Sequence, residues 1–265
     1  MKKLWIPLTY VVFLVLLIAP LVKIFTGAWA EGWNGFIEAL SRPQSLHALW
    51  MTFLITVIVT VVNTLFGVML ALYLVRADWL GRRMKQLLNS IVDLPFAVSP
   101  VIGGLMIVLL LGPNTVLGAL FEDVGFKVVY AMPGMIIATL FVTFPLMVRE
   151  IMPVLQEIGA QQEEAASTLG AYSWYTFWHV TWPSIRWGVI YGVVLTVARS
   201  MGEFGAVLVV SGNIINKTQT ATTLVYQDVE NFNVIAANSL ALVLAAVSVG
   251  LLLMMEWAKK RKEVH

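Results

Sequence analysis

The sequence predicts an all-α membrane protein with six transmembrane helices. Of its 265 residues, 59% are hydrophobic and 12% are charged, and the mean hydropathy is +0.84. Soluble domains carry about 25% charged residues, so this composition requires a lipid environment. The apolar residues also come in long blocks, and about 20 of them suffice for a helix to cross roughly 30 Å of hydrocarbon.

Six apolar blocks separated by polar loops are the predicted spans. They cover residues 4–25, 46–75, 87–111, 129–147, 187–210 and 234–255. The first block follows Lys2 and Lys3, and Ala28-Trp29-Ala30 has the small-x-small pattern of a signal-peptide cleavage site. Signal peptides have apolar regions of about 7 to 15 residues, so the longer block favours an uncleaved span. Pro95 and Pro100 predict an interruption in the third block.

The spans define three parts of the chain. Residues 1–45 hold the first span and an external linker, and residues 46–258 form the transmembrane domain. The linker includes the interfacial residues Trp29 and Trp33. Residues 259–265 make a basic tail. A polar loop at about residues 150–186, called the coupling loop below, interrupts the domain between the fourth and fifth spans.

The basic residues predict which side of the membrane each loop faces. Of 17 Lys and Arg, twelve lie in the N-terminal segment, in residues 76–85 and 149–186, and in the tail. Four lie in or near the opposite loops: Lys23, Arg42, Lys127 and Lys217. Arg199 falls inside a span. Short cytoplasmic loops carry the excess of Lys and Arg, so both termini and the coupling loop are predicted to be cytoplasmic.

The coupling loop carries the most informative motif. Good helix formers run from Val154 to Leu169, and Gly170 and Pro183 follow as helix-ending and helix-starting signals. Structured loops of about 15 residues or more usually serve a function. We therefore expect the coupling loop to hold a partner.

The spacing of this motif resembles the cytoplasmic signature of permease subunits in bacterial ATP-binding-cassette importers. Glu164-Ala165-Ala166, Gly170 and Pro183 match that signature, while Val180 and Trp182 stand where isoleucine and leucine are usual. The resemblance implies a type I importer permease fold whose cytoplasmic coupling helix sits in a groove of the ATPase subunit.

On this interpretation, residues 161–171 enter the ATPase groove. The contact residues are Glu163, Glu164, Ala165, Ala166, Gly170 and Pro183. Glu164 would anchor to a basic residue of the ATPase, and Gly170 would allow a left-handed turn or a close approach. The alternative is an ordinary capped surface helix. Trp174, Trp178 and Trp182 recur every four residues, so they share a helical face that meets either lipid headgroups or a protein partner.

Arg199 and Glu203 form a candidate site within the fifth span. Arg199 lies twelve residues beyond Trp187, about 18 Å along a helix, near the middle of the hydrocarbon layer. A charge there requires a partner or a watery cavity, and Glu203 is one turn away on the same face. The pair either gates an anion path or fixes the packing of the span. The small residues Ala198, Gly202 and Ala206 form a stripe that lets another helix approach.

Asp93 is a further candidate, near the cytoplasmic end of the third span. It pairs with the nearby arginine loop of residues 76–85, or its proline-kinked helix lines the pathway.

Three further stretches resemble the sulfate/thiosulfate importer permeases, and the second of the two paired subunits most closely. They are residues 93–100, 145–150 and 198–206. The resemblance implies a complex of two related permease subunits, two ATPase subunits and an external sulfate-binding protein. Two alternatives stay open: a molybdate or tungstate permease, which shares the Gly202-Glu203-Phe204-Gly205-Ala206 stretch, and a nucleotide-independent secondary transporter.

The chain itself lacks the motifs of an enzyme. It has no cysteine, its three histidines are scattered, and Asn216-Lys217-Thr218 lacks the glycine that a phosphate-binding loop requires. We therefore expect no metal or cofactor in this chain, no nucleic-acid partner, and ATP and Mg²⁺ bound by the separate ATPase.

Overall fold

The computed structural model describes residues 2–77, 79 and 81–263, and side-chain positions from residue 9 to residue 257 except at residues 17, 78 and 80. Within these ranges every regular element is a helix. The helices are α1 Lys2–Ala28, α2 Gly32–Ser41, α3 Pro43–Arg76, α4 Arg82–Ala97, α5 Pro100–Leu111, α6 Val116–Asp123, α7 Met132–Ile158, α8 Gln161–Thr168, α9 Ser173–Thr176, the π-helix η1 Phe177–Thr181, α10 Trp182–Met201, α11 Gly205–Ser211, α12 Ala221–Glu230 and α13 Val234–Glu263.

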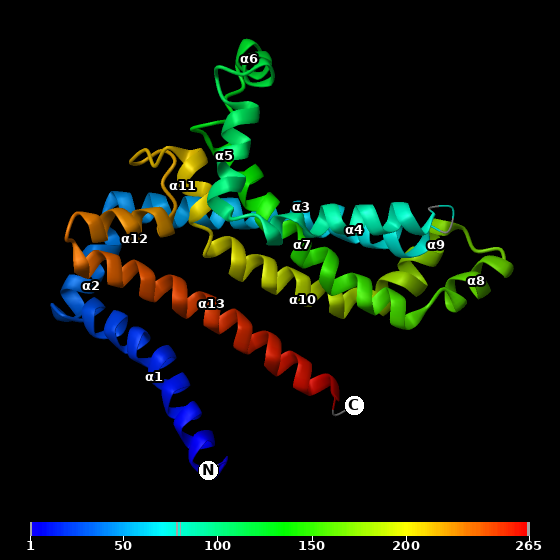
Figure 1. Ribbon diagram of the computed structural model, residues 1–265, viewed down its shortest axis with the longest axis horizontal. Coiled ribbons are helices and arrows are strands. Elements are labelled where there is room, and N and C mark those ends of the chain that lie inside the picture. Colours follow the sequence, from blue (N-terminus) through cyan, green and yellow to red (C-terminus); the bar gives the residue numbers. More distant parts are fainter. Residues whose placement is uncertain (1, 78, 80, 264–265) are drawn as a thin grey trace.

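Long helices run along the length of an elongated body (Figure 1). α3 packs against α7 and α10, and α10 also contacts α13. α1 contacts α13 as well, and the two helices diverge away from the end that holds α2 (Figure 1). α8 lies at one end of the body, while α2 and α12 lie at the opposite end (Figure 1). We call these the α8 end and the α12 end.

The number of apolar helices agrees with the predicted six spans. Five helical segments in the described residues are long and apolar enough to cross a membrane, and the bent pair α4–α5 brings the number to six if it counts as one span. The interruption predicted for the third span is confirmed, because the chain bends by 108° between α4 and α5. Pro95 lies inside α4, and the break falls at Val98 and Ser99, directly before Pro100, where proline disfavours helical backbone in the preceding residue.

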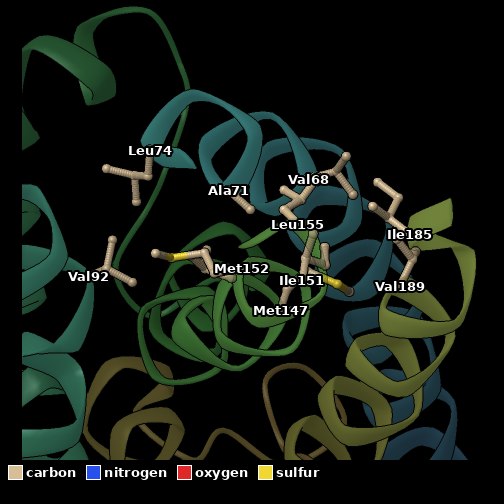
Figure 2. Close-up of a cluster of buried hydrophobic side chains, with 11 residues drawn as sticks. Val68, Ala71, Leu74, Val92, Met147, Ile151, Met152, Leu155, Ile185 and Val189 are labelled. Atoms are coloured by element: carbon tan, nitrogen blue, oxygen red, sulfur yellow. The ribbon is translucent and has the colours of Figure 1, made fainter. Parts of the chain in front are cut away.

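The largest apolar core lies toward the α8 end, where α3, α4, α7 and α10 meet (Figure 2). Its buried residues are Val68, Ala71, Leu74, Val92, Met147, Val148, Ile151, Met152, Leu155, Ile185 and Val189. Met147 lies at the centre, fully buried. A Cβ added to Gly192 of α10 would lie 2.5 Å from its sulfur atom, so the glycine lets α10 approach α7 closely.

Two helices end at other residues than the predicted spans do. The fourth span continues beyond residue 147 as a single helix, α7, to Ile158. Its last turns bury Ile151 and Leu155 against α3 and α10, so packing inside the bundle prolongs the helix past Arg149. The fifth span was predicted to run to residue 210, but α10 ends at Met201 and the short α11 follows after a break.

The segments predicted as loops contain helices as well. The linker of residues 27–45 includes α2, and the predicted loop after the fifth span includes α12. α12 begins with a reciprocal capping box between Thr220 and Thr223, which satisfies the free backbone groups of its first turn. The basic tail begins inside α13, whose backbone stays helical to Glu263. The side chains of the tail lie outside the described residues.

Candidate functional site

α8 is an exposed helix at the tip of the coupling loop. None of its eight residues, all of which the structure describes, is buried. Glu164 and Ala165 are exposed, and Ala166 is half-buried. Leu169, which follows the helix, is 88% exposed. The helix therefore presents a mixed polar and apolar surface to its surroundings.

Gly170 ends α8 in the left-handed conformation that the sequence predicts. Its φ is +84°. The Gly170 amide donates to the Ser167 carbonyl at 3.0 Å, and the Ala171 amide donates to the Ala166 carbonyl at 3.1 Å. These two bonds make a Schellman motif, in which a glycine satisfies the last carbonyls of a helix. No atom lies within 4 Å of a Cβ built on Gly170, so the turn is open on its outer side.

The continuous helix predicted from Val154 to Leu169 is wrong, because the chain breaks at Gly159. This residue has φ +68° and ψ −174°, a combination that is essentially restricted to glycine. α7 ends at Ile158 and α8 begins at Gln161. Two glycines with positive φ therefore bracket α8.

Glu163 joins α8 to the bundle. Its Oε2 accepts a hydrogen bond from Nε of Arg76 at 2.8 Å, and its Oε1 accepts one from Oγ1 of Thr181 at 2.8 Å. The adjacent Glu164 is exposed to solvent. Of the two neighbouring carboxylates, one is thus engaged inside the chain and the other faces outward.

The three tryptophans after α8 form a ladder, as their spacing predicts. Ring centroids are 5.6 Å apart for Trp174 and Trp178, and 5.7 Å apart for Trp178 and Trp182. Trp174 and Trp178 are exposed, whereas Trp182 is half-buried against the main core. Pro183 occupies the second position of α10, where its missing N–H leaves no hydrogen bond unmade.

Arg199 and Glu203 form an ion pair at the break between α10 and α11. Arg199 Nη1 lies 2.8 Å from Glu203 Oε2; the Glu203 side chain is 1% exposed and that of Arg199 is 40% exposed. Glu203 Oε1 also accepts from the Ala206 amide at 3.0 Å, and the Glu203 carbonyl accepts from Thr222 Oγ1 at 2.7 Å. The carboxylate therefore caps α11, while its backbone is tied to α12.

The prediction that Ala198, Gly202 and Ala206 form a stripe on one helix is wrong, because the helix stops between Ala198 and Ala206. Close packing does occur at one of its members. A Cβ on Gly104 of α5 would lie 2.6 Å from the carbonyl oxygen of Ala206. α11 and α5 thus touch at the backbone.

Asp93 pairs with Arg149 of α7, and not with the arginine loop of residues 76–85. Arg149 Nε donates to Asp93 Oδ1 at 2.8 Å, and Nη2 donates to Oδ2. Both side chains are partly exposed. The bond holds α4, the first half of the bent pair, against the extended end of α7.

At the α12 end, a hydrogen bond changes the pKa of one ionisable side chain, Tyr226. Tyr226 Oη donates to the Glu230 carboxylate at 2.5 Å. That hydrogen bond and the negative charge of Glu230 raise the pKa of Tyr226 above its ordinary value.

Comparison with known proteins assigns the family. Residues 63–263 match the model of the binding-protein-dependent transport system inner membrane components. The chain belongs to this family. It is 44% identical over 264 residues to the sulfate transport system permease protein CysW of Synechocystis sp., covering 100% of this chain and 95% of that protein. It is 47% identical over 233 residues to the protein of the same name from Synechococcus elongatus, covering 88% of this chain and 80% of that protein.

A solved structure shares the fold. One chain of a bacterial ABC transporter that imports the acidic polysaccharide alginate superposes with a TM-score of 0.80 at 17% identity, covering 98% of this chain and 94% of that one. The predicted all-α permease fold is thereby confirmed, and the family together with the apolar helices shows a multi-pass protein of the inner membrane. As a member of a transport family, the chain is a permease and not an enzyme.

Sequence reasoning missed several residues that position the permease's coupling loop. Arg76, Gly159 and Thr181 make or shape the contacts of Glu163. Arg76 did carry a signal, because it is the first charged residue after a long apolar block. Nothing in the sequence indicated which carboxylate, 87 residues away, it would meet.

Proposed function

We propose that this permease subunit forms half of the translocation pathway of an ATP-driven importer for sulfate and thiosulfate. The substrate class is supported by the sulfate permeases, more than 40% identical to the chain over most of its length. One structural observation carries the coupling mechanism: α8 stands exposed between two positive-φ glycines at one end of the bundle. An exposed, predominantly polar helix held between two turns suits contact with a groove in a partner protein.

In this proposal the coupling loop and both termini are cytoplasmic, as the distribution of Lys and Arg supports. α8 contacts a separate ATP-binding-cassette ATPase, which binds ATP and Mg²⁺ and carries out hydrolysis. A second, related permease supplies the other half of the pathway. An external sulfate-binding protein delivers the ion to the α12 end.

The contact chemistry follows from the exposure of each residue. Glu164 projects from α8 and pairs with a basic side chain of the ATPase, while Ala165 and Gly170 allow the two backbones to approach. Pro183 starts α10 rigidly behind the contact. Closure of the ATPase dimer on ATP would displace α8 and, through it, the bundle.

Arg199 and Glu203 serve this function as a neutralised pair at the α10–α11 break. A carboxylate beside the arginine weakens its attraction for an anion, so a structural or gating role fits better than direct contact with the substrate. Asp93 and Arg149 would act in the same way as a second, partly exposed ion pair, between α4 and α7.

The test of the coupling mechanism is Gly170→Leu in the complete complex reconstituted in liposomes. A leucine at φ +84° is strained, and its side chain occupies the open outer side of the turn. We expect ATP hydrolysis to persist while sulfate uptake per ATP falls by about fivefold or more, as when typical coupling between two sites is lost. Wild-type coupling in this variant would contradict the proposal.

Gly125→Leu is the matched control. Gly125 also has a positive φ, +78°, and also has no atom within 4 Å of a Cβ, but it follows α6, far from α8 along the chain. Its coupling should match that of the wild type. Comparing sulfate, thiosulfate and molybdate in the same vesicles tests the substrate: ATP-dependent uptake of molybdate alone would favour the molybdate permease.

A further inference from the structure

α8 has no apolar anchor in the bundle. It buries none of its eight described residues, and the glycines on either side, Gly159 and Gly170, have open space around them. Positive-φ glycines at both ends allow the chain to bend there. The orientation of α8 relative to the long helices must therefore be set by polar contacts.

Those contacts converge on one carboxylate. In the described part of the chain, the side-chain hydrogen bonds that join α8 to other elements all end on Glu163. Oε2 accepts a hydrogen bond from Nε of Arg76, at the end of α3. Oε1 accepts one from Thr181, at the end of η1, and a longer one from Nη2 of Arg76 at 3.5 Å. The side chains of Glu163 and Arg76 are each only 22% exposed, so the pair is substantially shielded from water.

Arg76 also holds the end of α7. Its Nη2 donates to the Gly159 carbonyl at 2.6 Å, and its Nη1 donates to the Leu155 carbonyl at 3.3 Å. The last carbonyls of a helix lack partners within the helix and carry its negative dipole end, so a guanidinium suits this position. The Arg76 side chain thus joins α3, α7 and α8 at the turn around Gly159.

We propose that Arg76, Glu163 and Thr181 form a latch that makes α8 move as one body with α3. The latch rests on the proposed function, since it assigns the route by which the ATPase displaces the bundle. These are positioning residues: the proposed contact with the ATPase is made by Glu164 and its neighbours, and the latch fixes the angle at which α8 is held.

The reach of α3 makes this attachment significant. α3 is continuous from Pro43 to Arg76, and at its other end Thr52 Oγ1 accepts from the Ala221 amide, the first residue of α12, at 2.8 Å. The 24 residues between Thr52 and Arg76 span about 36 Å of helix. If the latch holds α8 to α3, a displacement of α8 is therefore transmitted to α12 through a single helix. Thr222 then connects α12 to the Glu203 carbonyl.

The first test uses Arg76→Gln and Glu163→Gln in the complete complex, with ATP hydrolysis and sulfate uptake measured on the same vesicles. Each variant should still copurify with the ATPase and hydrolyse ATP, while uptake per ATP falls by about fivefold or more. The exchanged pair, Arg76→Glu with Glu163→Arg, should recover part of the loss, because it restores the attraction between the two positions but not the bonds to the Leu155 and Gly159 carbonyls or to Thr181. Glu157→Gln, an exposed carboxylate at the end of α7, is the control and should behave as wild type.

A second test remains informative if the exchanged pair folds poorly. The chain contains no cysteine, so Arg76→Cys with Glu163→Cys introduces the only thiols in this subunit. Before treatment, this pair should show the same low coupling as the glutamine variants. A bifunctional thiol reagent that bridges the two positions should restore uptake per ATP, since a covalent link replaces the ion pair.

The latch is overturned if the bridged protein hydrolyses ATP but does not transport, because α8 must then move away from α3. It is also overturned if both glutamine variants couple as the wild type does. The proposed function fails separately: in that case the wild-type complex itself shows no ATP-dependent uptake of sulfate or thiosulfate, or does not bind an ATPase.

Discussion

The two ends of the bundle are each held by an arginine and a carboxylate, but they are held differently. At the α12 end, Arg42 donates two bonds to Asp228, at 2.6 and 3.2 Å, and the Asp228 side chain is 6% exposed. α12 is further fixed by its capping box and by Thr52. At the α8 end, Glu163 is the point of attachment, between two open glycines.

The difference separates anchoring from movement. Segments with few buried contacts open at low free energy, and the elements that move in a mechanism come from this class. α12 is fixed by several buried polar bonds, whereas α8 is free to pivot except where the latch holds it. We infer that the ion pair at the α12 end contributes mainly to stability, and the one at the α8 end mainly to coupling.

Arg42→Gln should give the largest loss of stability. It leaves the Asp228 carboxylate buried without a counter-ion, which costs about 3 kcal/mol, the lower end of the range for a broken buried pair, because Arg42 is 25% exposed. Thermal unfolding in detergent measures this. Adding Asp228→Asn should recover part of the loss, and Lys217→Gln, an exposed basic residue near the same end, is the control. An unchanged unfolding temperature would show that the α12 end is not anchored by this pair.

Arg199→Gln should have an intermediate effect. The Glu203 carboxylate is almost fully buried and would lose its cation, but Arg199 is 40% exposed, so we expect about 2 kcal/mol, below the full cost of a buried pair. If pairing is the main role, the double variant with Glu203→Gln should be more stable than Arg199→Gln and should transport at a similar rate to the wild type. Loss of transport in the double variant, with normal stability, would instead assign Arg199 to the pathway.

Glu163→Gln should have the smallest effect on stability and a large effect on coupling. A partly exposed ion pair contributes about 0 to 1 kcal/mol, and glutamine can still accept the bond from Thr181. The unfolding temperature should therefore change little, while uptake per ATP falls. Equal losses of stability for Glu163→Gln and Arg42→Gln would remove the distinction between the two ends.

The sequence predicted the features that depend on local composition. Apolar blocks gave the spans, and Gly170 gave the end of α8 because a glycine after a helical run favours the left-handed turn. The break at Gly159 was missed, since good helix formers surround it and one glycine costs a helix only about 1 kcal/mol. The break after Met201 was missed for a similar reason, because it lies within an apolar block whose composition favours a continuous span.

Tertiary contacts account for the rest of what was missed. Asp93 lies closer in sequence to the arginine loop than to Arg149, its partner. The partners Arg76 and Glu163 are 87 residues apart, and Arg42 and Asp228 are 186 apart. Such pairings depend on how the long helices pack, and residue spacing along one helix carries no information about them. The pair Arg199 and Glu203, four residues apart, was predictable for this reason.

The most direct test of the account is labelling of a single cysteine at Ala165, an exposed position on α8 in a chain without native cysteines. In membranes that hold the Ala165→Cys permease without its ATPase, a membrane-impermeant thiol reagent should react only from the cytoplasmic side. Bound ATPase should block the reaction, and removal of the ATPase should restore it. Labelling from the external side, or equal labelling with and without the ATPase, would contradict the central claim that α8 is the surface on which the ATPase acts.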